Sequence, residues 1–327
     1  MGILVLGGTQ FVGKAIVEDL LANGEKVSIF HRGKTGPGLF EGQVEHLIGD
    51  RESDVSALEG RTFDAVVDVS AYRPRVIRNM ANALKGNVGQ VSFVSTISIY
   101  APSPTPWKED SEILEMPEGQ DENADITGET YGALKVLCER ELEREFGDRV
   151  TYHRIGLQVG PYDHTDRFGD WIERIGHRQR VIVPQDTNIN WQLADVRDTA
   201  AFITHCVQKE KFGVFNVNGA VHPMNEVLEM IRSEVNPNCE FVPMSDEQLE
   251  TNEVAFWKEM TLWLPMANRD TNFLQCSVEK ALATGHSIRP MSQTIKDSWS
   301  YLQTLDFHRE RKSGSGLPAS KEDKILG

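Results

Sequence analysis

The chain has 327 residues, an apolar content of 39%, 27 glycines and a formal net charge of −15 at pH 7. A chain of this length buries a large core and is long enough for two lobes. The negative charge repels the phosphate backbone of a nucleic acid, and the sequence has no basic patch beyond short runs such as residues 309–312. We therefore expect no nucleic-acid partner. No stretch approaches the roughly 18 uninterrupted apolar residues of a membrane span, and no basic leader region opens the sequence. We therefore expect a soluble, cytoplasmic protein without a membrane partner.

The four cysteines are far apart in the chain, with no C-x-x-C pair and no histidine cluster at ligand spacing. We therefore expect reduced cysteines that act as packing residues, and no metal site. They are Cys138, Cys206, Cys239 and Cys276.

The first predicted strand, residues 4–6, enters a glycine-rich turn that opens a helix over residues 14–21. Free backbone N–H groups and the positive end of the helix dipole suit a pyrophosphate. The usual spacing is Gly-x-x-Gly-x-x-Gly, and Gln10 replaces its middle glycine. The turn predicts a dinucleotide site, with a purely structural turn as the alternative. The candidate residues are Gly7, Gly8, Thr9, Gln10, Phe11, Val12 and Gly13.

The second predicted strand, residues 26–30, ends at His31, Arg32 and Lys34. At this position of a Rossmann unit an acid binds the ribose 2′-hydroxyl, whereas an arginine accommodates a 2′-phosphate. We expect His31 and Arg32 to contact the adenosine ribose. No acid stands there, so NADP is slightly favoured over NAD. An arginine stacked on adenine and a solvated basic loop are the alternatives.

Three further strands are predicted at residues 44–48, 63–69 and 91–95, with a helix over 76–84. Asp50 follows the first of them, where a carboxylate can accept the adenine amino group. Ser70 and Ala71 follow the second, near the middle of a bound dinucleotide, and we expect both to contact it. The alternation of strands and helices predicts an α/β fold with a right-handed, doubly wound parallel sheet.

Hydroxyl groups cluster where the strand at 91–95 ends, at Thr96, Ser98 and Tyr100. Open α/β sheets hold their ligands at this edge, so Tyr100 is a candidate substrate contact. The next segment, residues 101–126, has four prolines and eight acids. It is predicted to be a surface loop, either a lid or a solvated insertion.

The predicted helix that follows carries Tyr131 and Lys135 one turn apart on one face. An ammonium close to a phenol favours the phenolate and is expected to lower the pKa of Tyr131 from its usual value of about 10. Tyr131 is therefore a candidate general acid and base. Tyr-x-x-x-Lys also occurs on ordinary helices.

Three motifs occur in order: the turn at residues 7–13, Ser95-Thr96-x-Ser98-Ile99-Tyr100, and Tyr131-x-x-x-Lys135. With them, the sequence resembles an extended short-chain dehydrogenase/reductase of the NAD-dependent epimerase/dehydratase family. The resemblance extends over about residues 2–302. Further matching fragments are Gly160-Pro161-x-Asp163, Val196-Arg197-Asp198, Phe215-Asn216-Val217-x-Gly219 and residues 297–299.

The resemblance implies that Tyr131 exchanges a proton with a substrate hydroxyl or carbonyl, while Lys135 holds the nicotinamide ribose. Thr96 would bind the same substrate oxygen, with Ser98 assisting. It also implies a bound NAD(P), hydride transfer at the carbon bearing that oxygen, and a sugar, nucleotide sugar or sugar-like substrate.

The resemblance further implies that Asp50 and Arg51 bind the adenine end, and that a homodimer forms through the helix bearing Tyr131. The 4,6-dehydratases of this family carry two acids after the threonine, where this chain has Ile97 and Ser98, so that activity is not expected. Gln10 departs from the family pattern. A degenerate Rossmann protein that binds nucleotide or RNA without redox turnover is therefore the alternative.

The second half of the chain predicts a smaller mixed α/β substrate lobe with helices near residues 225–235 and 277–283. Arg167 and Trp191 are candidate substrate contacts, since Arg167 can pair with a phosphate or carboxylate; a surface ion pair is the alternative. We expect a dinucleotide-binding domain over residues 1–160, rejoined by about 190–219, and a substrate lobe from residues 161–189 and 220–305. The polar tail, residues 306–327, is expected to be a linker with one short docking helix.

Overall fold

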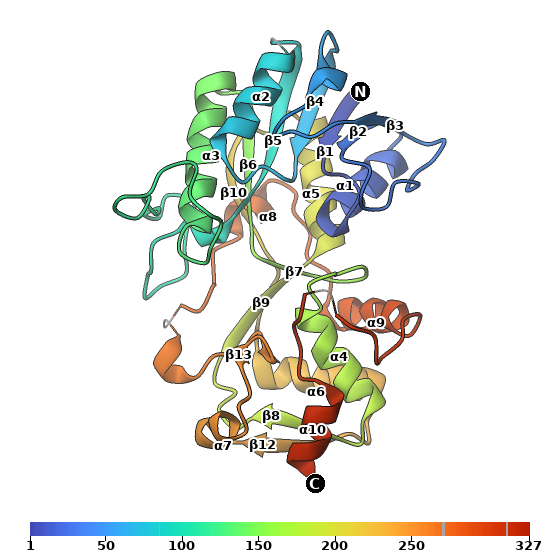
Figure 1. The fold of residues 1–327 in the computed structure, drawn as a ribbon, viewed down its shortest axis with the longest axis vertical. Helices are drawn as coiled ribbons and strands as arrows, with labels where there is room; N and C mark the ends of the chain where they lie inside the picture. Colours follow the sequence, from blue (N-terminus) through green and yellow to red (C-terminus); the bar gives the residue numbers. More distant parts are fainter. Residues whose placement is uncertain (85, 270–271, 312) are drawn as a thin grey trace.

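The computed structural model describes residues 1–84, 86–269, 272–311 and 313–327, so Lys312 of the basic run lies outside the described residues. Figure 1 shows two lobes, one above the other. The upper one, which we call the sheet lobe, contains the N-terminus and the large sheet. The one below it, which we call the lower lobe, contains the C-terminus.

Within the described residues the large sheet has seven strands in the order β10-β6-β5-β4-β1-β2-β3. All neighbouring strands pair in parallel. The order reverses between β1 and β4, which is where open α/β sheets bind ligands. The strands are β1 (Gly2–Leu6), β2 (Lys26–His31), β3 (Glu45–Ile48), β4 (Phe63–Asp68), β5 (Val88–Thr96), β6 (Val150–Ile155) and β10 (Gly213–Val217).

The central strands are apolar throughout because helices cover both faces of the sheet. In β1, Ile3 and Val5 pack toward α1 (Phe11–Ala22) and α5 (Val196–Gln208). The alternate residues Leu4 and Leu6 pack in the cluster that contains α2 (Pro74–Leu84) and α3 (Tyr131–Phe146). This arrangement confirms the predicted Rossmann-type, doubly wound α/β fold.

Predicted and observed elements differ mainly at their ends. The strand predicted at 91–95 is longer, because Val88 already pairs with Phe63 of β4. The helix predicted at 277–283 forms as α8 (Glu279–Ala283), but its Ala281 packs with Phe215 of the large sheet. Its assignment to the substrate lobe is therefore wrong.

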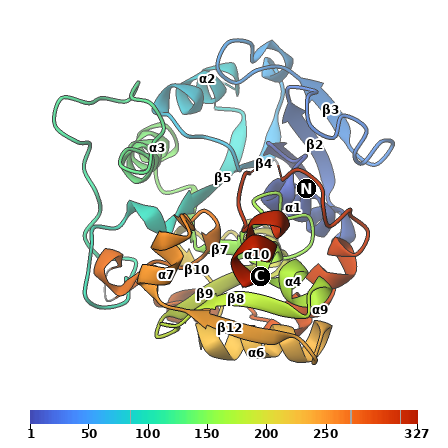
Figure 2. The same cartoon turned by 60° about the horizontal axis from the view of Figure 1, so that its bottom comes forward.

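The lower lobe has a two-stranded parallel sheet formed by β8 (Arg180–Pro184) and β12 (Glu240–Met244). Figure 2 brings α10 (Ala319–Leu326) and the C-terminus forward, over this sheet. The other helices are α4 (Arg167–His177), α6 (Met224–Val235), α7 (Asp246–Thr251) and α9 (Met291–Leu302). Short strands are β13 (Phe256–Trp257) and β14 (Met260–Thr261); β7 (Leu157–Val159), β9 (Asn190–Asp195) and β11 (Val221–Pro223) form a sheet between the lobes.

Three tryptophans form the centre of the lower lobe's core, and each is at most 2% exposed. Burial of an indole leaves its N–H in need of an acceptor. Trp171 donates to the Thr261 carbonyl at 2.9 Å, Trp191 to the Leu262 carbonyl at 2.9 Å, and Trp263 to the Asp186 carbonyl at 2.8 Å. These bonds attach the segment before α8 to α4 and β9.

The acidic segment 101–126 has no helix or strand of its own, but it contacts other parts of the chain near both ends. The Trp107 ring lies 5.6 Å from the Tyr100 ring, and its backbone N–H donates to the Gln275 carbonyl at 3.0 Å. Near the other end, Arg73 donates to the Ala124 carbonyl at 2.9 Å.

No helix among the described residues is both long and apolar enough to cross a membrane.

Candidate functional site

The glycine-rich turn between β1 and α1 depends on the absence of side chains at two positions. Gly7 has a φ of +92°, and a Cβ there would lie 2.9 Å from the Ser70 Oγ. A Cβ on Gly13 would lie 2.0 Å from the Gly7 carbonyl oxygen. The outer glycines of the motif therefore allow the turn to fold back against the first turn of α1.

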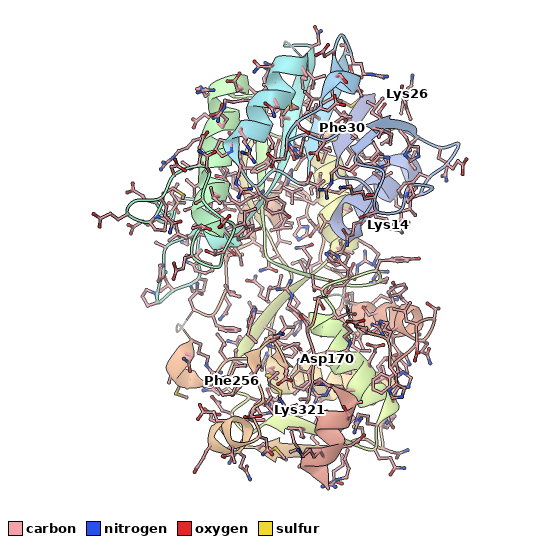
Figure 3. All side chains as sticks on the ribbon, in the orientation of Figure 1. Lys14, Lys26, Phe30, Asp170, Phe256 and Lys321 are labelled. Carbon is pink, nitrogen blue, oxygen red and sulfur yellow. The ribbon has the colours of Figure 1, made fainter. Side chains whose placement is uncertain are left out.

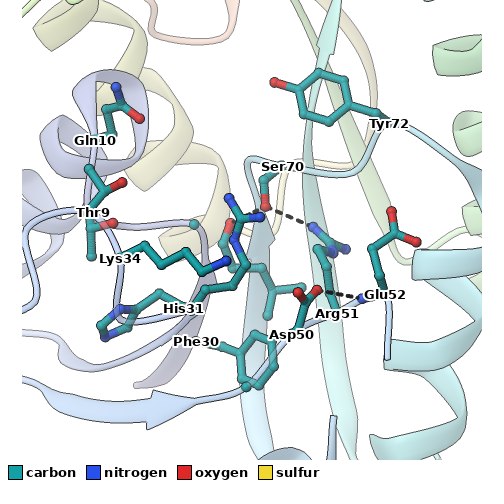
Figure 4. A pocket seen from close by; sticks show the side chains of 15 residues that line it. Thr9, Gln10, Phe30, His31, Lys34, Asp50, Arg51, Glu52, Ser70 and Tyr72 are labelled. Carbon is teal, nitrogen blue, oxygen red and sulfur yellow. Dashed lines mark hydrogen bonds between the residues drawn. The ribbon is translucent and has the colours of Figure 1, made fainter. Parts of the chain in front are cut away.

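The first turn of α1 leaves its backbone N–H groups free of side-chain caps, since Gln10 at the N-cap makes no capping bond. A cavity of about 310 Å³ lies beside this turn, at the carboxyl ends of β1, β2 and β4. Figure 4 shows Thr9, Gln10, His31 and Lys34 on one side of it and the residues that follow β3 and β4 on the other. The lining residues include Gly7, Thr9, Gln10, His31, Arg32, Lys34, Asp50, Arg51, Ser70 and Tyr72.

The cavity fits the pyrophosphate of a dinucleotide, because Gly7 carries no side chain into it and the first turn of α1 beside it has no side-chain cap. The remaining motif residues pack behind the turn. Phe11 and Val12 contact the core cluster of β1 and α1. A Cβ on Gly8 would approach the Val17 side chain to 2.8 Å, so Gly8 also faces the core.

A histidine pair shapes the end of β2. His31 and His46 are joined by a 2.9 Å contact between ring nitrogens, and the Gly33 N–H donates to the other nitrogen of His31 at 3.1 Å. Burial and the neighbouring His46 lower the pKa of His31. Arg32 and Lys34 follow, both exposed at the cavity, and among the described residues neither has a carboxylate within 4.0 Å.

Arg51 binds a carboxylate of its own chain across the cavity floor. Its two terminal nitrogens lie 2.7 and 2.6 Å from the Asp68 oxygens, and one also donates to the Ser70 Oγ at 3.0 Å. Asp68 also accepts the N–H groups of Ser70 and Ala71, each at 3.1 Å. Burial alone would raise the pKa of Asp68, but the facing guanidinium holds it below its usual range.

Asp68 was absent from the sequence-derived candidates, although a carboxylate at the end of an otherwise apolar strand was a visible signal. Asp50 lines the cavity next to Arg51 and accepts the Glu52 N–H at 3.0 Å. The part of the cavity next to β3 therefore presents one carboxylate in an Asx turn and one guanidinium that is already paired.

The catalytic candidates meet where β5 ends and α3 begins. Gly132 makes this possible, because a Cβ there would lie 2.0 Å from the Ser98 carbonyl oxygen. Thr96 accepts the Ser98 N–H at 3.1 Å, and its hydroxyl acts to lower the pKa of Tyr131. The close approach of α3 thus brings its first turn against the turn that follows Thr96.

Tyr131 lies beside Tyr72, which lines the cavity. Burial and the neighbouring Tyr72 raise the pKa of Tyr131 to about 12, while the Thr96 hydroxyl and Arg167 act in the opposite direction. The ring centroids of Tyr72 and Tyr131 are 6.1 Å apart.

The ammonium group of Lys135 is bound by backbone carbonyls. It donates to the Ala71 carbonyl at 3.0 Å and the Val94 carbonyl at 2.7 Å, and lies 3.9 Å from the centroid of the Phe93 ring. Burial lowers the pKa of Lys135 to about 8. The expectation that Lys135 lowers the pKa of Tyr131 is therefore wrong for this structure, because the ammonium is directed at backbone carbonyls.

Two expected substrate contacts lie in packed interiors. Tyr100 is 4% exposed; it donates to the Asn216 Oδ1 at 2.6 Å and accepts from Arg154 at 3.0 Å. Trp191 belongs to the tryptophan core of the lower lobe. Neither side chain faces the cavity in this structure, so both assignments are corrected to packing roles.

Arg167, the first residue of α4, is half-buried, and its positive charge acts to lower the pKa of Tyr131. Its Nε donates to the Thr165 hydroxyl at 3.2 Å. Within the described ranges no carboxylate lies within 4.0 Å of its guanidinium, and burial lowers the pKa of Arg167. The remaining donors are available to an anion.

A curated relative, the chloroplast stem-loop binding protein of 41 kDa b from Arabidopsis thaliana, is 25% identical to this chain over 234 residues. The match covers 66% of this chain and 58% of the relative, so the chain matches less than two thirds of that protein's length.

Solved structures with the same fold include sugar-nucleotide enzymes. UDP-glucuronic acid 4-epimerase from Bacillus cereus, in complex with UDP-glucuronic acid and NAD, has a TM-score of 0.70 at 15% identity, covering 94% of this chain and 100% of that one. The NAD-dependent NDP-hexosamine 5,6-dehydratase TunA has a TM-score of 0.68 at 17% identity, covering 94% and 99%. These similarities show the fold.

The family model of the NAD dependent epimerase/dehydratase family matches residues 3–218. That match includes the glycine-rich turn, the end of β5 and the first turns of α3. The chain therefore belongs to the NAD dependent epimerase/dehydratase family.

Proposed function

We propose that this protein is an NAD(P)-dependent epimerase or oxidoreductase that acts on a hydroxyl or keto carbon of a sugar, nucleotide sugar or sugar-like molecule. The observation that carries this proposal is the close packing of α3, at Gly132, on the turn that follows Thr96, with the Tyr131 ring 6.1 Å from that of Tyr72, which lines the cavity of the glycine-rich turn. Relatives of the same fold bind NAD and UDP-sugars, which supports the substrate class.

Tyr131 supplies the proton. Because its pKa is raised to about 12, the phenol stays protonated at neutral pH and donates to a substrate carbonyl oxygen. Thr96 hydrogen-bonds the same oxygen and orients it, and Ser98 assists from the adjacent turn. A nicotinamide dinucleotide, when bound, supplies the hydride donor or acceptor.

Other residues hold the reactants. The turn at residues 7–13 would bind the pyrophosphate, and Lys135 fixes the Ala71 carbonyl at the cavity's edge. Arg32 and Lys34 supply two cations near the expected ribose, which favours NADP slightly over NAD. Arg167 would pair with an anionic group of the substrate.

Ile97 and Ser98 stand where the related 4,6-dehydratases carry acids, so we propose epimerisation or reduction rather than that elimination.

We also propose a cytoplasmic homodimer formed through α3. Size-exclusion chromatography with light scattering tests the dimer, and a monomer at micromolar concentration would contradict it.

A second candidate is nucleotide or RNA binding without redox turnover. It is favoured by the name of the curated relative, a stem-loop binding protein. The net charge of −15 and the presence of Thr96, Tyr131 and Lys135 weigh against it.

The experiment compares wild type with Tyr131→Phe. Fluorescence titration with NADH and NADPH is expected to give submillimolar binding for both proteins. Turnover of a UDP-sugar panel, followed by mass spectrometry and NMR, is expected to fall at least about 100-fold in the variant, since general acid catalysis contributes about that much. Retained turnover would refute the mechanism. Absence of dinucleotide binding together with binding of a stem-loop RNA would favour the second candidate.

A further inference from the structure

Residues 160–166, between β7 and α4, form a segment that we call the strap. It contacts the first turn of α1, next to the glycine-rich turn. The Lys14 ammonium lies 3.9 Å from the centroid of the Tyr162 ring, and the Phe11 and His164 rings are 6.0 Å apart. Figure 3 shows Lys14 at the end of α1 nearest the lower lobe. The strap therefore lies against the helix end that would hold the pyrophosphate.

Two residues of the strap have an unusual backbone conformation. Tyr162 and Asp166 have φ values of +67° and +54°, a region that residues other than glycine rarely adopt. Such conformations persist when surrounding contacts fix them. Besides Lys14 over the Tyr162 ring, each of these two residues has a contact with the C-terminal part of the chain.

One of these contacts is aromatic and the other is ionic. The ring of Tyr301, on α9, lies 4.4 Å from that of Tyr162. Arg309, in the tail, donates to the Asp166 Oδ1 at 2.9 Å, and Asp166 is 7% exposed. Arg309 also reaches both oxygens of the fully buried Glu173, on α4.

The tail itself is held firmly on the lower lobe. Arg311 pairs with Asp170 and with Glu173, the latter at 3.0 Å. Glu322 of α10, 0% exposed, accepts from Arg174 at 2.5 and 3.1 Å and from the Ile182 N–H at 2.8 Å. Figure 3 labels Asp170, a residue of α4, in the lower lobe. Burying a carboxylate without a partner costs free energy of folding. These ion pairs therefore attach the tail to the lower lobe.

We propose that Arg309 is a positioning residue of the dinucleotide site: through Asp166 it holds the strap against α1. The inference rests on the proposed dinucleotide binding and extends it to a residue about 300 positions away in the sequence. Coupling between two sites is reciprocal. A dinucleotide on α1 therefore strengthens the attachment of the tail, as the tail strengthens binding of the dinucleotide.

The test compares Arg309→Gln with the matched control Arg311→Gln in the full chain. Both variants lose a partner of Glu173, but only Arg309 contacts Asp166. Titration with NADH and NADPH is expected to show affinity weakened about fivefold or more in Arg309→Gln and by less than about twofold in Arg311→Gln. Thermal unfolding midpoints measured alongside are expected to fall in both variants. Equal changes of affinity in the two variants would show that Arg309 has only a structural role.

A second measurement uses the wild type alone, so it does not depend on the folding of a variant. Hydrogen exchange at residues 160–166 and 306–311 is expected to slow when the protein is saturated with the tighter-binding dinucleotide. Unchanged exchange at 306–311 would overturn the coupling. Wild-type protein that binds neither dinucleotide would overturn both this inference and the proposed function, whereas dinucleotide binding without coupling would overturn this inference alone.

Discussion

Arg51 and Lys135 both direct their charges at the short segment that follows β4. Arg51 binds Asp68 and Ser70, and Lys135 binds the Ala71 carbonyl from the other side. The segment 68–71 is therefore fixed by two cations that sequence reasoning had assigned to ligand contact or to tyrosine activation. At the scale of the residue, the hydrogen bonds of Arg51 and Lys135 therefore fix the backbone next to the cavity.

Asp68→Asn is expected to lower the free energy of unfolding by about 3 kcal/mol, because it leaves the Arg51 guanidinium without its buried partner. Urea unfolding followed by circular dichroism measures this loss. Glu52→Gln is the matched control, since Glu52 pairs with Arg75 at the surface. That control is expected to lose less than about 1 kcal/mol. Equal losses would show that the Asp68 pair contributes no more than a surface pair.

The same pair predicts a pH dependence. The pKa of Asp68 in the folded protein lies below its ordinary value of 3.8. Its carboxylate therefore stabilises the fold above that ordinary value, and this stability is lost as the pH falls through the folded pKa. The acid limb of the unfolding free energy is expected to flatten in Asp68→Asn and to persist in Glu52→Gln.

At the scale of the element, the site depends on how closely α3 approaches the turn η2 (Ile97–Ile99) at the end of β5. Gly132→Ala would place a methyl group 2.0 Å from the Ser98 carbonyl oxygen, so α3 must shift. We expect kcat to fall at least about tenfold, since small displacements of reacting groups are costly. Dinucleotide affinity should change by less than about twofold, because the glycine-rich turn lies on other elements.

Gly128→Ala is the control for this prediction, since a Cβ there would meet nothing within 4 Å. Steady-state kinetics and fluorescence titration on both variants provide the measurements. An unchanged kcat in Gly132→Ala would mean that the distance between Thr96 and Tyr131 does not limit the reaction.

The parallel sheet could be predicted from the sequence because buried strands and covering helices leave local signals. The apolar runs of β1 and β4 and the helical spacing of α1 depend on nearby residues alone. The three ordered motifs also identified Thr96, Tyr131 and Lys135 as candidates. Their use in catalysis is still a prediction.

The errors concern residues whose surroundings come from distant parts of the chain. Tyr100 and Trp191 were assigned to substrate, yet their partners Asn216 and Leu262 are 116 and 71 residues away in the sequence. The same applies to Lys135, whose acceptor Ala71 is 64 residues away. A single sequence does not show which distant residue will be the hydrogen-bond partner of a given side chain.

At the scale of the whole molecule, the two lobes have separate cores, and the tail belongs to the lower one. Five of the six tryptophans lie in or against the lower lobe's core. Intrinsic fluorescence therefore reports mainly on the lower lobe, whereas dinucleotide binding reports on the sheet lobe. The stability of each lobe can thus be followed in the same sample.

Glu322→Gln is expected to destabilise the lower lobe by about 3 kcal/mol, because Arg174 then loses the nearer of its two buried carboxylate partners and keeps only Asp170, at 3.5 Å. In urea, the tryptophan fluorescence midpoint should fall well below that of the wild type, while dinucleotide binding in the absence of urea changes little. Asp323→Asn, which removes an exposed partner of Arg178, is the control and should shift the midpoint only slightly. A fluorescence midpoint of Glu322→Gln equal to that of Asp323→Asn would show that the buried contacts of Glu322 contribute no more than an exposed pair.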